Sequence, residues 1–486
     1  MAPDRNASFR LMTTRSLSRR RLLATPLLLP LLAAAKGADP AARLGPASEA
    51  GWLLFDPADG RVLDARLADR PFAPASVAKL PTVVAALALL GPGHRFTTGL
   101  HGTGAVVEGT LRGNLILKGG GDPSLVGEDV AAMLDGLIEK GVRRVAGRFL
   151  HDASALPELP EIDAGQPRTA GYNTGLGALS LNFNRVQLAW RRLPGGAVEA
   201  GVWSVSDIGR HPVDGIGVEV VPASALPDTV LVAPLPDRGG ERWQLAPHRG
   251  APARVWLPVA RPGAMTAAVV HAMAAERGIA LPRPSAGQLP PEARLLVMHE
   301  SPPLAELAAR VLKHSNNLSA ELIGLAAART LDANVATLAG SAALLAGWLR
   351  AQRPDVDWTG FRLLNHSGLT SGSRMTARQT AAVLTLGGEL LAALLAGDDE
   401  GGPLPGVRAK SGTLAYAKGL AGWLRTASGR SLGFVYYAGD DRARAALDAA
   451  MDRRVAEIPP EARAWLARAR GLQSELLAAW RDAPAP

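Results

Sequence analysis

Apolar positions are grouped in three different ways along this chain of 486 residues, and each grouping predicts a different structure. Near the start, residues 52–63 hold two apolar runs around a turn rich in Asp, Pro and Gly, which predicts a β-hairpin. Residues 77–90 then form an almost unbroken apolar run that ends at Gly91, as expected of a buried helix. Pro81 fits only the first turn of a helix, so we expect this helix to begin close to Ser76.

The middle of the chain, residues 96–290, changes to short runs of β-forming residues bounded by glycine and proline. Its glycines form no phosphate-binding loop and are interpreted as turn formers. The predicted strands lie at 111–117, 198–205, 215–221 and 253–259, and the predicted helices at 129–140 and 266–277. This pattern predicts an insertion of one or two mainly β modules.

After residue 302 the apolar spacing becomes helical again and then returns to strands. Helices are predicted at 304–312, 318–330, 335–350, 376–395 and 442–455, and strands at 407–415, 419–424 and 431–437. Because strands lie at both ends of the chain with helices between them, we expect the ends to join in one sheet of an α+β fold. A last helix at 461–480 carries a stripe of tryptophan and leucine that either packs on the body or touches a membrane or partner, and packing is favoured.

Composition limits the partners and the compartment. The formal net charge is +9, but residues 1–35 hold six arginines and one aspartate and so contribute +5. The remainder is too weakly basic to indicate nucleic acid as a partner. An arginine-rich start, an apolar run over 22–35 and the small residues before Ala35 predict an export signal, for either the twin-arginine or the general secretory route. Cysteine is absent, which excludes a thiol nucleophile and a cysteine-ligated metal.

Candidate chemistry begins with Ser76 and Lys79 at the entry to the apolar helix. A spacing of three places both side chains on one helix face, where the amine reaches the hydroxyl. A desolvated lysine with a lowered pKa can take the proton of a serine and make it a nucleophile. Ser-x-x-Lys alone is weak evidence, because Ser76 in that position would also be an ordinary helix cap.

Two further polar motifs follow in order, Ser315-x-Asn317 between two helices and Lys410-Ser411-Gly412-Thr413 in a strand. Each alone has a structural explanation, a turn for the first and an edge strand for the second. All three in this order match the signature of β-lactamases and penicillin-binding proteins, Ser-x-x-Lys with Ser-Asp-Asn and Lys-Thr-Gly. The combination therefore favours function over chance.

The chemistry assigns each of these residues a task. Ser315 can relay a proton between Lys79 and the leaving amine, and Asn317 can hold Lys79 and the substrate amide. Lys410 and Thr413 can bind a terminal carboxylate, with Ser411 keeping the hydroxyl of the usual threonine. Gly412 allows the substrate backbone to approach the strand. The backbone N–H groups of Ser76 and Thr413 are the expected oxyanion hole.

With these motifs the sequence resembles the class C low-molecular-mass penicillin-binding proteins, D-alanyl-D-alanine carboxypeptidase/endopeptidases of peptidoglycan, over nearly all of the mature chain. The separation of 239 positions between Ser76 and Ser315 supports the likeness, because β-lactamases place these motifs much closer together, whereas that family carries a large insertion here. Further segments that resemble this family lie at 96–98, 119–125, 178–184 and 410–414.

The resemblance implies a penicillin-binding core, an antiparallel sheet flanked by helices, with mainly β inserted domains. The catalytic domain would comprise residues 36–95 and 291–458, the insertion 96–290 with one accessory domain nested in the other, and a C-terminal helix 459–486. It implies a periplasmic serine DD-peptidase, with its signal cleaved near Ala35, that acts on peptidoglycan stem peptides and is inhibited by β-lactams. No cofactor, metal or nucleic-acid partner is expected, and membrane association is expected to be peripheral at most.

Two departures from that family concern substrate preference. The Asp-Gly-Ser-Gly-Leu-Ser segment of the family is Asn-His-Ser-Gly-Leu-Thr at 365–370, and the arginine that follows it is displaced, with Arg374 as the candidate. The acidic residue that the insertion of the family offers to the side-chain amine of the substrate is not preserved in the motif, and Asp163 is the candidate for it.

Other classes of enzyme, and a non-catalytic protein, fit the sequence less well. A Ser-His-Asp hydrolase would need a nucleophile elbow, whereas Gly-x-Ser-x-Gly at 429–433 leads from a hairpin turn into a strand. A zinc peptidase lacks His-Glu-x-x-His. A β-lactamase differs from a penicillin-binding peptidase in that its penicilloyl-enzyme is hydrolysed fast. A non-catalytic envelope-binding protein of the same fold would not need the motif residues.

Overall fold

The two ends of the chain meet in one antiparallel sheet, as the sequence predicts. The computed structural model describes residues 39–235, 241–248, 251–397, 405–455 and 457–482. The predicted export signal lies outside the described residues. The main sheet has the strand order β18-β19-β20-β1-β2, formed by β1 (Glu49–Phe55), β2 (Val62–Arg66), β18 (Val407–Leu414), β19 (Ala417–Arg425) and β20 (Ser431–Gly439).

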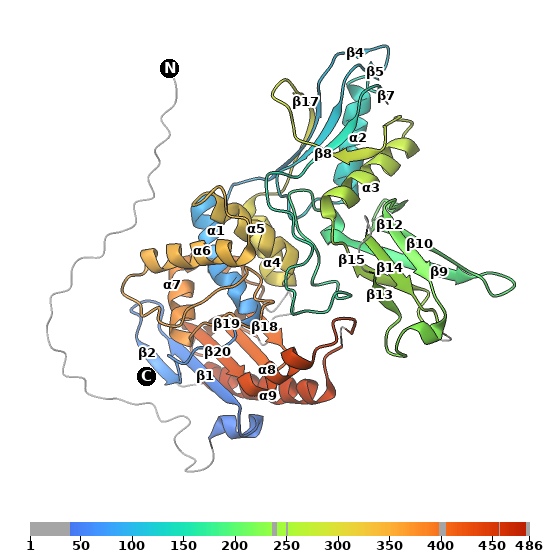
Figure 1. Ribbon diagram of the computed structural model, residues 1–486. Coiled ribbons are helices and arrows are strands. Elements are labelled where there is room, and N and C mark those ends of the chain that lie inside the picture. The colour runs from blue at the N-terminus through green and yellow to red at the C-terminus, as the bar shows by residue number, and fades with distance from the viewer. Residues whose placement is uncertain (1–38, 236–240, 249–250, 398–404, 456, 483–486) are drawn as a thin grey trace, which may run out of the picture.

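Helices cover one face of this sheet (Figure 1). They are the 3₁₀ turn η2 (Ala75–Ala78), α1 (Lys79–Leu90), α4 (Leu304–His314), α5 (Asn317–Arg329), α6 (Leu338–Gln352) and α7 (Ala377–Leu394). The side chains of α1 are buried from its first residue to Leu87, so α1 runs through the centre of the core. Pro81 lies in its first turn, where its missing N–H costs nothing.

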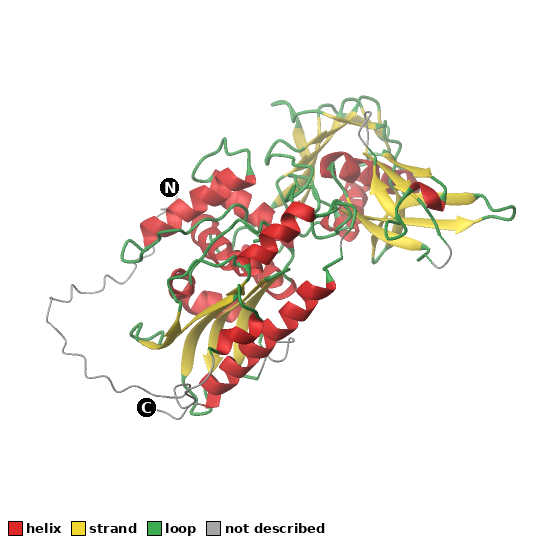
Figure 2. Ribbon diagram, turned by 60° about the horizontal axis from the view of Figure 1, so that its bottom comes forward, coloured by secondary structure: helices red, strands yellow, loops and turns green. Residues whose placement is uncertain are grey.

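The opposite face of the main sheet is covered by α9 (Pro460–Asp482), as Figure 2 shows from a second direction. The shorter helix α8 (Asp441–Ala450) follows β20 and buries only Arg444. The apolar stripe of α9 is buried against the sheet, with Trp465 2% and Trp480 4% exposed. Their indole N–H groups donate to Ser48 Oγ and Asp64 Oδ2, at 2.9 and 2.8 Å. The stripe therefore packs on the body. Among the described helices, none has both the length and the apolar character of a membrane span.

The described residues between α1 and α4 form four small sheets and two α-helices. The order β16-β8-β6-β3-β17 joins β3 (Thr97–Gly102), β6 (Leu115–Gly119), β8 (Phe149–Asp152), β16 (Pro284–Ala286) and β17 (Arg294–Glu300). The order β11-β10-β9-β15 joins β9 (Arg185–Arg192), β10 (Val198–Ser206), β11 (Gly209–Pro212) and β15 (Arg254–Pro258). Three-stranded sheets are formed by β12 (Ile216–Val220), β13 (Val232–Pro234) and β14 (Glu241–Leu245), and by β4 (Val106–Val107), β5 (Thr110–Leu111) and β7 (Arg144–Val145). The helices are α2 (Gly127–Glu139) and α3 (Pro262–Glu276).

The predicted elements are found with three differences. The predicted strand over 111–117 is two strands, because the turn at 112–114 separates β5 from β6. The helix predicted over 376–395 is interrupted at Gly388, whose φ of 53° is outside the helical region. The helix predicted over 442–455 ends at Ala450, and the chain then runs across to the insertion.

A shared apolar cluster joins the insertion to the helical layer. It combines Leu156, Ile162, Leu176 and Ala178 of the insertion with Leu318, Leu322 and Leu325 of α5, Leu338 of α6 and Leu369. Leu176, Leu322 and Leu325 are fully buried in it. The first turn of α5, which carries Asn317, is therefore fixed from the insertion side.

Candidate active site

Ser76 lies in η2 and Lys79 is the first residue of α1, so a single continuous stretch holds both. Lys79 Nζ is 3.0 Å from Ser76 Oγ. At the first residue of this turn, Ala75 has φ 47°, a left-handed conformation in which a small side chain is an advantage. Opposite it stands Gly368, where a Cβ would lie 1.8 Å from the Ala75 carbonyl oxygen. The neighbouring loop can therefore approach the turn only as glycine.

Two acceptors besides Ser76 surround the amine of Lys79. Its Nζ is 2.8 Å from Asn317 Oδ1 and 2.8 Å from the carbonyl oxygen of Ser367. Its side chain has no exposed surface. Burial, reinforced by the charge of Lys410, holds the pKa of Lys79 well below its ordinary value, while Glu321 acts in the opposite direction. A neutral amine beside a serine hydroxyl is the arrangement that general-base chemistry requires.

Ser315 and Asn317 lie where α4 passes into α5. Ser315 adopts φ 56° directly after the last residue of α4, and the side chain of Asn316 caps α5 by accepting from the N–H of Ser319. The abrupt reversal turns Asn317 toward Lys79. Its other amide atom, Nδ2, donates to the carbonyl oxygen of Tyr172 at 3.1 Å, so the insertion contacts the site directly.

Lys410 on β18 completes the polar cluster. Its Nζ donates to Ser315 Oγ at 2.9 Å and to the carbonyl oxygen of Ser411 at 2.9 Å. Only 2% of its surface is exposed. Burial, together with the charge of Lys418, lowers the pKa of Lys410 to about 7. The structure thus brings together all five residues that the sequence predicts as catalytic, Ser76, Lys79, Ser315, Asn317 and Lys410.

The other residues of the predicted strand motif, Ser411, Gly412 and Thr413, differ in their exposure and contacts. Thr413 lines the cleft beside Ser76, and its Oγ1 accepts from Lys418 Nζ at 3.1 Å. Ser411 is exposed. Gly412 packs against the serine turn, where a Cβ would lie 2.5 Å from the Pro74 carbonyl oxygen and 3.0 Å from the Ser76 nitrogen. The space that Gly412 provides is therefore filled by the protein's own turn.

Glu321 is the neighbour of the site that the sequence reasoning missed. It is fully buried and accepts from the backbone N–H groups of His366 and Ser367, both at 2.9 Å. Burial raises the pKa of Glu321, and those hydrogen bonds and the charge of Lys79 oppose the rise. A signal was present, because Glu321 follows Asn317 by four positions and is therefore on the same helix face. Ser367 and Tyr172 act through carbonyl groups and give no such signal.

Two clefts meet at the motif residues. A cavity of about 520 Å³ contains Ser76 and is lined by Tyr172, Leu369 and Thr413, among others. A larger cavity of about 1110 Å³ extends between α4 and the insertion. Both include Ser315 and Asn317. Polar groups at the junction of two clefts can serve a substrate that is larger than a dipeptide.

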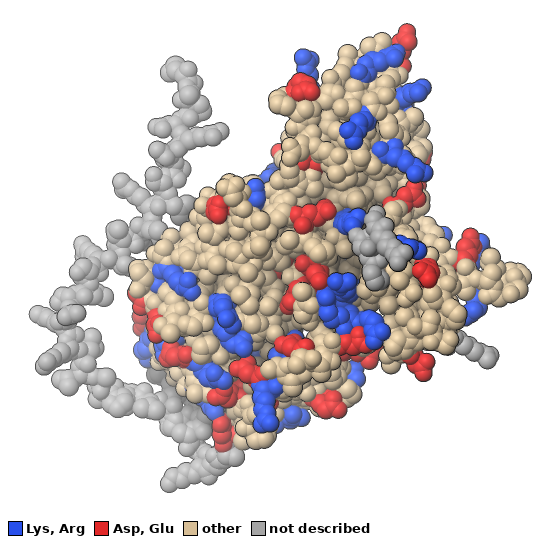
Figure 3. Space-filling view, in the orientation of Figure 1, with Lys and Arg blue, Asp and Glu red and all other residues tan. Residues whose placement is uncertain are grey.

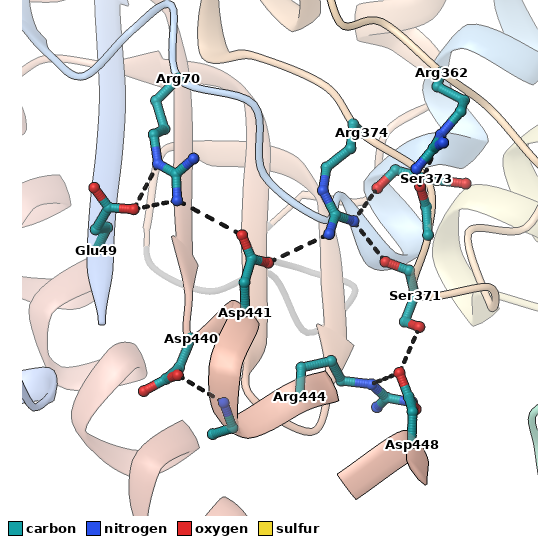
Figure 4. A network of polar contacts seen from close by, with 12 residues as sticks. Glu49, Arg70, Arg362, Ser371, Ser373, Arg374, Asp440, Asp441, Arg444 and Asp448 are labelled. Atoms are coloured by element: carbon teal, nitrogen blue, oxygen red, sulfur yellow. Dashed lines mark hydrogen bonds and ion pairs between the residues drawn. The ribbon is translucent and has the colours of Figure 1, made fainter. Parts of the chain in front are cut away.

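Neither candidate for the displaced family residues lines the smaller cleft. Arg374 donates to the carbonyl oxygens of Ser371 and Ser373 and pairs with Asp441 at 3.4 Å, within the network of Figure 4. Asp163 closes a turn by accepting from the N–H of Gly165 at 2.8 Å. The acidic residues that do line that cleft are Asp452 and Glu457.

The fold and this cluster define a penicillin-binding serine peptidase. A family model described as the D-Ala-D-Ala carboxypeptidase 3 (S13) family matches residues 38–389. The chain belongs to this family and is a hydrolase of the serine D-Ala-D-Ala carboxypeptidase type. The matched residues include the first two motifs, whereas Lys410 lies beyond them.

Relatives support the same assignment. A D-alanyl-D-alanine carboxypeptidase of Actinomadura sp. strain R39 is 26% identical over 419 residues, which cover 77% of this chain and 74% of the relative. D-alanyl-D-alanine carboxypeptidase DacB of Haemophilus influenzae is 25% identical over 453 residues, covering 86% and 90%. The crystal structure of penicillin-binding protein 4 (dacB) from H. influenzae matches with a TM-score of 0.70 at 22% identity, over 90% of this chain and 98% of that one. This likeness shows the fold.

Proposed function

We propose that this serine DD-peptidase works through an acyl-enzyme on Ser76 and acts on D-alanyl-D-alanine ends, D,D-crosslinks or both in peptidoglycan. The observation that carries the proposal is the 3.0 Å approach of the buried, low-pKa amine of Lys79 to Ser76 Oγ. In this proposal residues 36–95 and 291–458 form the catalytic domain, and residues 96–290 form the insertion.

The protonation state of Lys79 follows from its three neighbours. A neutral amine has two N–H bonds and one lone pair. Asn317 Oδ1 and the Ser367 carbonyl can only accept, so they take the two N–H bonds. The lone pair is then left for the hydroxyl proton of Ser76. Ser76 Oγ attacks the carbonyl carbon of the penultimate D-alanine as that proton passes to Lys79.

The remaining motif residues have tasks in the same cycle. Lys410, Ser411 and Thr413 bind the terminal carboxylate, with Gly412 holding their strand against the serine turn. Ser315 relays the proton from Lys79 to the leaving amine, so D-alanine departs as the C–N bond breaks, the acyl group stays on Ser76 Oγ and Lys79 is neutral again. Lys79 then activates a water that hydrolyses the ester. The N–H groups of Ser76 and Thr413 stabilise the oxyanion in both steps.

β-Lactams mimic this substrate and are the expected inhibitors. A structure of the H. influenzae protein in complex with a β-lactam matches this chain with a TM-score of 0.69, which supports the proposal by fold. A fluorescent penicillin should label the wild type and leave Ser76→Ala unlabelled. Ser431→Ala is the matched control, because Ser431 is the exposed serine of the Gly-x-Ser-x-Gly segment. Equal labelling of wild type and Ser76→Ala would overturn the assignment.

Product analysis separates the enzyme classes. Purified protein should release D-alanine or monomeric muropeptides from isolated peptidoglycan, as detected by mass spectrometry. A penicilloyl-enzyme that hydrolyses within seconds, without either product, would instead identify a β-lactamase. Labelling without any product or turnover would indicate a penicillin-binding protein whose function is not catalytic.

Export to the periplasm belongs to this proposal, with the signal cleaved near Ala35. The arginine-rich, apolar leader supports it. N-terminal sequencing of protein from the periplasmic fraction should begin after Ala35, and recovery of the full-length chain in the cytoplasm would contradict it. No nucleic-acid partner is proposed, since acidic and basic side chains are interspersed on the face shown in Figure 3.

A further inference from the structure

Two tryptophans and a glutamine form a row across the outer face of the sheet β11-β10-β9-β15. The register pairs Trp203 on β10 with Gln187 on β9, and Gln187 with Trp256 on β15. Directly paired residues project from the same face of a sheet. The alternate positions, Val186 and Leu257 among them, are buried in the core of the insertion, so the row faces away from that core.

Trp203 lies flat on the sheet, and Trp256 is the more exposed of the two indoles. A Cβ on Gly201 would lie 2.4 Å from the Trp203 ring, so that indole lies down over the glycine two positions before it. Trp256 is 47% exposed. A large apolar ring left open on the solvent face of a strand, where polar residues are usual, indicates a contact surface.

An arginine lies over each indole. The Arg210 guanidinium carbon is 5.1 Å from the Trp203 ring centroid, and that of Arg185 is 5.8 Å from the Trp256 ring centroid. Within the described part of the chain, neither arginine forms an ion pair with a carboxylate. Indole surface, a primary amide and guanidinium N–H donors therefore share one surface, which we call the indole platform: Arg185, Gln187, Trp203, Arg210 and Trp256.

The indole platform is continuous with the candidate active site. Arg185 and Trp256 line the 1110 Å³ cavity whose other wall carries Ser315 and Asn317. They also line a second hollow of about 340 Å³ that reaches Val205, on the outward face of β10. A substrate bound at Ser76 thus has a path along the larger cleft to the platform.

We propose that the indole platform binds the glycan strand of peptidoglycan while a stem peptide of that polymer occupies the active site. Sugar rings pack by their apolar faces against exposed aromatic side chains, and amide and guanidinium groups hydrogen-bond to hydroxyl and acetamido oxygens. The inference rests on the proposed function for the choice of polymer. It gives the insertion a task of its own, which is to hold the strand while the peptide reaches Ser76.

Binding to glycan strands stripped of their peptides tests the proposal without requiring catalysis. The double variant Trp203→Ala/Trp256→Ala should bind these strands at least about tenfold more weakly than the wild type in a sedimentation assay. The matched control is Leu295→Ala/Met298→Ala, which removes apolar side chains that are 50% and 49% exposed on β17, in a different inserted sheet, and should bind normally. Circular dichroism checks that both variants are folded. We expect folding to be unchanged, because the two indoles face solvent.

Several results would overturn the proposal: no binding by the wild type, equal binding by wild type and double variant, or displacement by single-stranded DNA but not by chitooligosaccharides. Loss of self-association in the double variant, with glycan binding intact, would reassign the platform to contact between copies of the chain. Penicillin labelling reports separately on Ser76. Failure of the proposed function would appear in that labelling, and failure of this inference only in glycan binding.

Discussion

The hydrogen-bond partners of Lys79 explain why one buried amine can act as a base. An isolated lysine in the core would be costly in its charged form, and burial alone lowers its pKa. Asn317 and Ser367 fix the direction of its N–H bonds, so the lone pair points at Ser76. Glu321 in turn fixes the position of Ser367 by accepting its backbone N–H. Glu321 is therefore a positioning residue.

Replacing Glu321 with glutamine should alter both the rate and its pH dependence. The glutamine has one acceptor oxygen where the carboxylate has two, so one of the two backbone N–H groups loses its partner. The Ser367 carbonyl then shifts, and acylation by penicillin should fall by about tenfold or more. The Glu321 carboxylate raises the pKa of Lys79. Its removal lowers that pKa further, and because neutral Lys79 is the active form, the acid limb of the acylation rate should move to lower pH.

The control for this variant is Glu306→Gln, which removes an exposed carboxylate paired with Arg310 on α4. It should change neither the rate nor the acid limb, since surface pairs contribute little. A slower Glu321→Gln enzyme whose acid limb stays in place would indicate a structural role alone and contradict the electrostatic part of the prediction.

The lowered pKa of Lys410 predicts that substrate binding weakens as the pH rises above neutrality. Its pKa of about 7 means that it is charged below neutrality and loses its charge above. If the cation binds the terminal carboxylate, KM for a D-alanyl-D-alanine peptide should rise about fivefold from pH 7 to pH 8. The same peptide with an amidated C-terminus has no carboxylate and should show no such rise. Parallel pH profiles for the two peptides would assign Lys410 another task.

At the scale of elements, the site depends on how closely β18 approaches the turn η2. Gly412→Ala would place a methyl group 2.5 Å from the Pro74 carbonyl oxygen, within a rigid turn and a continuous strand pairing. Overpacking of this kind costs about 1–3 kcal/mol. Because the clash also displaces Ser76, we expect the variant to lose penicillin labelling. The protein should still fold, with a melting temperature several degrees below that of the wild type.

The matched control is Gly347→Ala in the interior of α6, where a Cβ meets no atom within 4 Å. An alanine there should stabilise the protein by about 0.5–1 kcal/mol and leave labelling unchanged. Melting temperatures and penicillin labelling of the two variants together show whether the close approach of Gly412 to the turn is needed for stability and for acylation. Normal labelling of Gly412→Ala would show that the turn adapts and that the close approach is not essential.

At the scale of the whole molecule, the apolar cluster around α5 joins the insertion to the helical layer, and we expect the two parts to unfold as one cooperative unit. Leu322 is fully buried there between the two parts. We expect a single calorimetric unfolding transition for the wild type. Leu322→Ser leaves a cavity and a buried hydroxyl, at a cost of about 3 kcal/mol, and should split the transition into two.

Leu477→Ser is the control for this prediction. Leu477 is similarly buried, but it lies between α9 and the main sheet, away from the insertion. It should lower the melting temperature without splitting the transition. Two transitions in the wild type would show that the insertion unfolds independently and that the cluster does not couple the two parts.

The sequence by itself determined the local elements and the types of residue in the site. An apolar run with an early proline was enough to predict where α1 begins, and the order of three polar motifs was enough to predict which side chains share a site. These features depend on neighbours within a few positions, where helix and strand periodicity act. The interrupted strand at 112–114 was missed because a glycine turn inside a β-like run leaves the same periodicity on either side.

Tertiary structure alone decided the contacts that depend on backbone atoms and on distant strands. The carbonyl groups of Ser367 and Tyr172 carry no sequence signature, because every residue has one. The row of Trp203, Gln187 and Trp256 exists only through strand register, which side-chain periodicity within one strand does not fix. Gly412 illustrates both cases: its motif marked it as part of the site, but only packing showed that its missing side chain makes room for the turn that holds Ser76.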